Sequence, residues 1–240
     1  MLTTPDSNGV FVYSGLNTTL RQRITLTLLA VALLFWHAHI TAAYDFDKLA
    51  ARAQEKYGEE TYRDVVQLDQ LITQIKTAPE LERLKKINDF FNQKILFADD
   101  ILLWGESDYW ATPLESLGKQ AGDCEDFTIA KYMFLRAANV PNQKLRLNYV
   151  RAMVNKDGRR LSQAHMVLSY YATPESEPLI LDNLNPEIRP ASSRTDLSPI
   201  FSFNDKGLWV GNGAKPRADS QTQLSRWRDV LLRMRLDGLE

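Results

Sequence analysis

The sequence predicts an α+β fold in which helices occupy the first part of the folded chain and an antiparallel sheet the second. Between Phe46 and Asn139, apolar residues recur three and four positions apart, as they do on one face of a helix. From Leu145 onward the spacing changes to two, as in half-buried strands. Helices and strands are therefore segregated along the chain, which favours an α+β domain over an alternating parallel one.

Four helices are expected before the sheet. The first two cover 46–57 and 62–76, and the third begins at Pro79, a residue suited to the first turn of a helix. The irregular segment 98–120 is expected to be a loop. A fourth helix is expected from Gly122 to Asn139, because the proline that follows Val140 disfavours its continuation.

An antiparallel sheet follows these helices. Asp157-Gly158 is a hairpin signal between two alternating segments. Strands are expected over 145–154, 163–171 and 179–182, with further strands near 201–209 and a closing helix over 224–236.

The first 43 residues have the pattern of a secretory signal. Arg21 and Arg23 precede the apolar run 24–36, and the small residues of 41–43 follow it. The apolar run is shorter than the ~20 residues of a membrane span. We therefore expect export, with cleavage after Ala43 and a mature domain over 44–240; the alternative is an uncleaved anchor.

Composition excludes several classes of function. Of 240 residues, 29 are Lys or Arg and 30 are Asp or Glu, giving a net charge of -1. This balance provides no general attraction for nucleic acid. The single cysteine excludes an intrachain disulfide and a cysteine-rich zinc site.

Three residues have the types and order of a nucleophile, a base and an orienting acid. Cys124 is the only cysteine, His165 is the only histidine after residue 43, and Asp182 ends an apolar strand. A thiolate at a helix start is favoured by the backbone N–H groups there, and an imidazole can accept the thiol proton. The backbone N–H of Cys124 is a candidate oxyanion donor. The alternative is a buried cysteine, a strand histidine and a turn aspartate with no shared role.

Asp123, Glu125 and Asp126 surround the cysteine. Unneutralised carboxylates would raise the pKa of the thiol, and a bound cation would remove that effect. Clustered oxygen ligands favour Ca²⁺ in an exported protein. The remaining ligands would be backbone carbonyls or further acids: Asp99, Asp100 or Asp108. Alternatively, acids in a first helical turn simply stabilise the helix.

Three segments together resemble one protein family. The segments 122–126 (GDCED), 163–168 (QAHMVL) and 181–183 (LDN) are similar to those of the bacterial transglutaminase-like cysteine proteinases. The resemblance covers roughly the whole mature chain and implies a papain/transglutaminase-like core. It implies Cys124 as nucleophile, His165 as base and Asp182 as orienting acid. It also implies a Ca²⁺ requirement tied to the three acids beside the cysteine.

Within this family the chain looks like the periplasmic members that release large adhesins from the outer membrane. The resemblance implies cleavage at paired alanines in the N-terminal region of a LapA-like adhesin, and hence control of biofilm attachment. It also implies inhibition by a LapD-like inner-membrane receptor for cyclic di-GMP. A tryptophan before the cysteine is expected at that contact, either Trp104 or Trp110.

Other functions remain open at this stage. The same three residues would serve a transglutaminase that transfers the acyl group to an amine. A non-catalytic calcium-binding interaction module with an inert cysteine is a second alternative. A peptidoglycan amidase with a papain-like fold is a weaker third.

Overall fold

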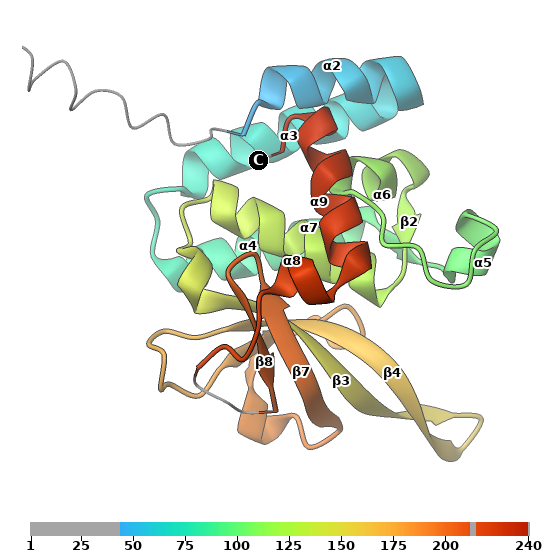
Figure 1. The fold of residues 1–240 in the computed structure, drawn as a ribbon. Coiled ribbons are helices and arrows are strands. Elements are labelled where there is room, and N and C mark those ends of the chain that lie inside the picture. The colour runs from blue at the N-terminus through green and yellow to red at the C-terminus, as the bar shows by residue number, and fades with distance from the viewer. Residues whose placement is uncertain (1–43, 212–214, 240) are drawn as a thin grey trace, which may run out of the picture. The chain divides into compact units, whose positions relative to one another are not determined.

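The computed structural model describes residues 44–211 and 215–239, which belong to a single compact unit. The expected export signal at 1–43 lies outside these residues and stays a prediction. Within the described ranges, no helix is both long and apolar enough to cross a membrane. Helices lie on one side of a six-stranded sheet, which confirms the α+β prediction (Figure 1).

Three amphipathic helices precede the cysteine, close to where the apolar spacing predicts them. They are α2 (Phe46–Tyr57), α3 (Glu59–Ile75) and α4 (Glu80–Lys94). Asp45 begins α2 because its carboxylate accepts a hydrogen bond from the Lys48 N–H at 2.9 Å. Each helix directs its apolar stripe into the core, where Leu49, Leu68 and Leu84 have no exposed surface.

The segment 98–120 is more ordered than the sequence prediction of a loop. It contains two short helices, α5 (Asp100–Leu103) and α6 (Pro113–Lys119). Thr112 and Glu115 form a reciprocal capping box at the start of α6, which explains why this short helix is stable. The two-residue strands β1 (Leu96–Phe97) and β2 (Ala121–Gly122) pair in parallel on either side of the segment. That pairing places α5 beside the start of the next helix.

The next helix, α7 (Cys124–Ala137), lies at the centre of the molecule and packs against α4, β3 and β4. Ten of its residues are buried, so it is surrounded on most sides. Phe134 stacks on Phe91 of α4 with ring centroids 5.5 Å apart, joining the helical layer to the centre.

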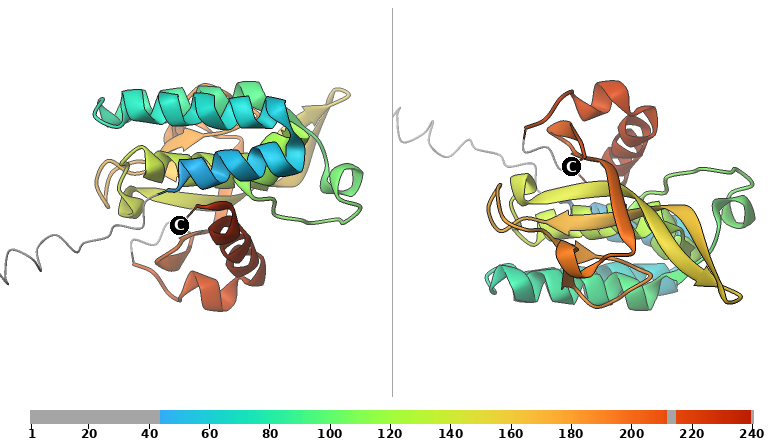
Figure 2. Two further views of the ribbon diagram at one scale, coloured as in Figure 1. Left: turned by 90° about the horizontal axis from the view of Figure 1, so that it is seen from above. Right: turned by 90° about the horizontal axis from the view of Figure 1, so that it is seen from below.

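The main sheet is antiparallel with the strand order β6-β5-β4-β3-β7-β8. A tight turn at Asp157 and Gly158, both with positive φ, joins its two long strands. The strands are β3 (Leu145–Lys156), β4 (Arg159–Tyr170), β5 (Leu179–Leu181), β6 (Arg189–Pro190), β7 (Leu197–Asn204) and β8 (Gly207–Val210). Seen from below, the sheet lies in front of the helices (Figure 2). The predicted strands are confirmed, and β4 begins four residues earlier than expected.

The last helices close the core. The short α8 (Ser220–Gln223) leads into α9 (Ser225–Asp237), whose Trp227 is fully buried against Tyr132 and Phe203. The two ends of the described chain are tied together, since the Asp45 N–H donates to the Gly238 carbonyl at 2.9 Å. Close to this contact, Asp237 receives hydrogen bonds from Arg52 at 3.1 Å and from Thr112 at 3.0 Å.

Candidate active site

Cys124 is the first residue of α7, and the local sequence explains why the helix begins there. Asp123 is the N-cap, with its carboxylate accepting from the N–H groups of Glu125 and Asp126. The Asp126 carboxylate returns to the Asp123 N–H, completing a capping box. The Cys124 thiol is therefore held at the positive end of the helix dipole.

Contacts between α7 and β4 bring the cysteine beside the strand that carries the histidine. Thr128, one turn after Cys124, donates from Oγ1 to the Met166 carbonyl at 3.1 Å. The main chain of Met166 also lies close enough to the Cys124 thiol to lower its pKa. Since Met166 directly follows His165, residues far apart in sequence meet at this point.

His165 and Asp182 form a buried pair. His165 Nε2 lies 2.8 Å from Asp182 Oδ1, and the two side chains are 2% and 0% exposed. The main chain of Asp182 is fixed separately, because its carbonyl accepts a hydrogen bond from Asn92 of α4 at 3.0 Å. The structure thus brings together the histidine and the aspartate that the sequence singled out.

A further residue, which the sequence does not single out, contacts the aspartate of this pair. Arg194 donates from Nη2 to Asp182 Oδ2 at 2.7 Å and is 5% exposed. Hydrogen bonds from His165 and Arg194 outweigh the effect of burial and lower the pKa of Asp182 to about 2. Asp182 is therefore an anion at neutral pH and can only accept hydrogen bonds. It follows that His165 Nε2 carries a proton and that Nδ1 is the ring nitrogen left to accept one.

Acidic side chains gather immediately beside Cys124, in two overlapping groups. Asp100, Asp123 and Asp126 each present an oxygen within 4.8 Å of the others, and Asp123 also forms such a group with Cys124 and Glu125. The three acids predicted from the sequence are thus joined by Asp100. Neither Asp99 nor Asp108, the other acids considered, belongs to these groups within the described residues.

These carboxylates suit a hard divalent cation. Burial, followed by repulsion from neighbouring acids, raises the pKa of Asp123 to about 9. Burial also raises the pKa of Asp126 to about 8, and hydrogen bonds from Ala111 and Asp123 only partly oppose it. Asp100 Oδ1 is buried and has no hydrogen-bond partner among the described residues. A buried carboxylate oxygen without a donor is costly, and a cation would supply the missing interaction.

The same acids affect the Cys124 thiol. Burial first, then the charges of Glu125 and Asp123, raises the pKa of the Cys124 thiol well above its ordinary value. The Cys124 Sγ donates to Glu125 Oε2 at 2.6 Å, which further favours the protonated thiol. This direction agrees with the expectation that unneutralised carboxylates oppose a thiolate.

Gly122 is required by the close approach of the capping box. A Cβ at this position would lie 2.8 Å from both Cβ and Oδ2 of Asp126. Any side chain here would displace an acid of the cluster. The glycine of the GDCED segment therefore has a steric role in the site.

The two tryptophans before the cysteine differ in accessibility. Trp110 is 8% exposed and stacks on Phe203 with ring centroids 5.7 Å apart, so it belongs to the core. Trp104 is only half-buried and lies beside Tyr109 and Lys119. Of the pair, Trp104 is the one that a partner can reach.

Comparisons with known proteins agree with this geometry. The family model described as bacterial transglutaminase-like cysteine proteinase BTLCP matches residues 54–211. The EGTA-treated structure of Legionella pneumophila LapG is 40% identical, with a TM-score of 0.70, and the match covers 80% of this chain and 98% of that chain. Its calcium-bound form is also 40% identical, with a TM-score of 0.67 and coverage of 79% and 98%. No curated protein gave a match. The chain therefore belongs to the bacterial transglutaminase-like cysteine proteinase family.

Proposed function

We propose that the protein is a calcium-dependent periplasmic cysteine endopeptidase. It cleaves the N-terminal region of a large LapA-like adhesin at a di-alanine site and so controls biofilm attachment. Cys124 is the nucleophile, His165 the base and Asp182 the orienting acid. The observation that carries this proposal is the buried His165–Asp182 pair, at 2.8 Å, beside the strand segment that contacts the Cys124 sulfur.

The proposed reaction follows from the protonation states at the site. His165 Nδ1 accepts the Cys124 proton, and the thiolate attacks the scissile carbonyl carbon. The Cys124 N–H at the start of α7 donates to the oxyanion that forms. His165 then gives the proton to the leaving amine, the C–N bond breaks and an acyl-enzyme remains. Water, deprotonated by His165, hydrolyses the thioester and restores the thiol.

Asp182 and Arg194 support the histidine during this cycle. The anionic Asp182 stabilises the imidazolium that forms when His165 accepts a proton. Arg194 fixes the second oxygen of Asp182, so that the carboxylate cannot rotate away from the ring. Both residues thus hold the proton on Nε2 and direct Nδ1 to the thiol.

Calcium is proposed to bind Asp100, Asp123 and Asp126, with Glu125 beside them. When bound, it supplies positive charge that neutralises the acids around Cys124. The existence of a calcium-bound form of Legionella pneumophila LapG, which is 40% identical to this chain, supports the choice of calcium as the ion. The chain's own support is the buried, partly unpartnered carboxylate cluster.

The test is cleavage of a purified N-terminal fragment of a LapA-like adhesin. Wild type is expected to yield two fragments, and Cys124→Ala is expected to yield none. EGTA should stop the reaction, and excess calcium should restore it. Cleavage by Cys124→Ala would end the proposal. A cross-linked or amine-tagged product in place of two fragments would assign the residues to acyl transfer instead.

Reactivity of the thiol separates an enzyme from a non-catalytic binding module. In the presence of calcium, iodoacetamide should label Cys124 faster than it labels a free thiol at neutral pH. Labelling no faster than the free thiol would favour an inert cysteine.

A LapD-like inner-membrane receptor is the proposed regulatory partner, with Trp104 at the contact. The support is the accessibility of Trp104 at the end of α5, the helix that begins with Asp100, whereas Trp110 is buried. Trp104→Ala should weaken binding to the receptor's periplasmic domain without changing the unfolding temperature. Undiminished binding by that variant would remove Trp104 from the contact.

A further inference from the structure

The central helix α7 carries a lysine that the proposed reaction does not use. Lys131 is 1% exposed, although a lysine is rarely fully buried unless it is paired. It lies seven residues after Cys124 and three after Thr128, so the three side chains share one face of the helix. On this face, Thr128 donates to the Met166 carbonyl of β4. Lys131 therefore lies on the side of α7 that faces the sheet behind the cysteine.

Two carboxylates from different elements act on the ammonium of Lys131. Asp182, which follows β5, acts on it most strongly, and Asp89 of α4 is second. Burial lowers the pKa of Lys131 to about 7, and these two carboxylates partly oppose that effect. The ring of Phe127, whose centroid is 5.7 Å from Nζ, adds a further attraction. The ammonium thus lies in the electric field of the carboxylate that pairs with His165.

Uncharged oxygens next to these carboxylates lack donors. Asn92 of α4 donates to the Asp182 carbonyl at 3.0 Å, and Asn88 donates to a carbonyl further along the same segment at 2.9 Å. These bonds attach that segment to the helix that packs against α7. The Oδ1 atoms of both asparagines, and of Asn183, are buried without hydrogen-bond partners among the described residues. An ammonium, with three N–H donors and no acceptor, has the chemistry that this region needs.

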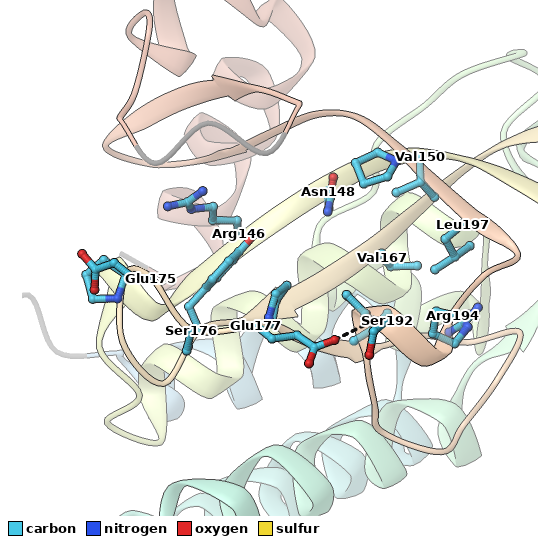
Figure 3. Close-up of a pocket in the computed structure, with 16 residues that line it drawn as sticks. Arg146, Asn148, Val150, Val167, Glu175, Ser176, Glu177, Ser192, Arg194 and Leu197 are labelled. Atoms are coloured by element: carbon cyan, nitrogen blue, oxygen red, sulfur yellow. Dashed lines mark hydrogen bonds between the residues drawn. The ribbon is translucent and has the colours of Figure 1, made fainter.

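Arg194 approaches the same carboxylate from the other face of the sheet. The outer face carries Val150 and Val167, which belong to an apolar cluster separate from the main core (Figure 3). Arg194 lines a cavity over that cluster and donates to Asp182 Oδ2. Lys131 belongs to α7, which packs against the sheet from the side of the main core. Asp182 is therefore under the influence of cationic side chains on both sides.

We propose that Lys131 is a positioning residue of this site, acting on Asp182 from the helical side as Arg194 does from the outer side. Its charge keeps the carboxylate ionised and turned toward His165 Nε2. This role rests on the proposed proteolysis. A lysine with a purely structural role would be dispensable, because exchanging a buried charge for an apolar side chain of similar size is often neutral or stabilising.

The test compares two matched substitutions in the full-length protein. Lys131→Met removes the charge and keeps an unbranched side chain of similar length. Lys144→Met makes the same change at a lysine that pairs with Glu80 at 2.8 Å where β3 begins. The observable is the NMR signal of the His165 Nε2 proton, identified by its loss in His165→Gln.

The signal should respond to the charge of Lys131 alone. At pH 6, Lys131→Met should shift the His165 signal from its wild-type position, and Lys144→Met should not. At pH 9 the shift should largely vanish, because a lysine whose pKa is lowered to about 7 is neutral there in the wild type as well. A structural role alone would leave the signal in place at both pH values.

Kinetics give the second readout. With the adhesin fragment and saturating calcium, Lys131→Met should lower kcat by about tenfold and leave KM unchanged, because Asp182 contacts no substrate. Thermal unfolding establishes that each variant is folded, and Lys131→Leu replaces Lys131→Met if the latter does not fold. A folded variant with the wild-type signal at pH 6 would overturn the proposal, whatever its kcat. So would a wild-type signal that stays constant from pH 6 to pH 9. If the wild type does not cleave the fragment, the proposed proteolysis fails, and the signal alone decides the role of Lys131.

Discussion

Calcium binding at the acidic cluster should release protons. In the cation-free protein, the pKa of Asp123 is raised to about 9 and that of Asp126 to about 8, so both are protonated at pH 6. A hard cation binds the ionised carboxylates and must displace these protons. Each calcium ion bound near pH 6 is therefore expected to release about two protons.

This release sets the pH dependence of affinity. When binding releases two protons, the association constant rises about 100-fold per pH unit. The apparent dissociation constant for calcium should therefore fall by about that factor between pH 6 and pH 7, and level off towards pH 9.

Stability should follow the same linkage. The folded pKa values of Asp123 and Asp126 exceed the unfolded value of 3.8. Such groups stabilise the fold fully below pH ~4 and lose that contribution as pH rises through their folded pKa values. The free energy of unfolding of the cation-free protein should therefore decline from pH 5 to pH 9. In saturating calcium both carboxyls are already ionised, so this decline should be smaller.

Calorimetry in two buffers of different protonation enthalpy measures the protons released. Asp123→Asn is the matched variant, because asparagine retains the helix cap and removes one titrating carboxyl. It should release about one proton and show a shallower dependence of affinity on pH. Wild-type binding with no proton release would refute the raised pKa values and the reasoning built on them.

Three further changes test other parts of the structure. Asp182→Asn should lower kcat by about 10³–10⁴-fold, because Arg194 would hold the amide oxygen and the NH2 group would face His165, favouring the wrong tautomer of the ring. Because the pKa of Asp182 is lowered to about 2, its ionised form stabilises the fold by ~2 kcal/mol above pH 4, and this contribution is lost as the pH falls through 2. Acid unfolding of Asp182→Asn should lack this pH-dependent contribution. Gly122→Ala should destabilise the fold by ~1–3 kcal/mol and weaken calcium binding, measured by denaturant unfolding and calorimetry, because its Cβ meets Asp126. Trp227→Ala should cost ~3–5 kcal/mol in denaturant unfolding.

Local signals explain which parts of the fold could be predicted. The first helix was predicted with its correct bounds, because a capping aspartate and an apolar stripe define it. The helix Pro113–Lys119 was missed, although Thr112 and Glu115 already carry its capping-box pattern. The early start of β4 could not be predicted from the sequence. Its first residues, 159–162, pair with the end of β3 where the hairpin extends past the core, and their side chains are exposed. Burial therefore imposes no alternation on that part of the strand.

The candidate site was predictable only in part. Residue type and chain order singled out Cys124, His165 and Asp182, since few cysteines and histidines compete. Asp100 was one of several acids considered, and only the parallel pairing of Leu96 with Ala121 brings it to the cluster. Arg194 carried no local signal, because its role depends on tertiary packing against Asp182.

The tie between the two ends of the domain constrains how the chain can fold during synthesis. Asp45 contacts Gly238, and Trp227 of the last helix fills the centre of the core. These contacts join segments almost a full domain length apart, and such contacts form slowly. The core cannot close until α9 has left the ribosome. Until then the chain lacks its final packing.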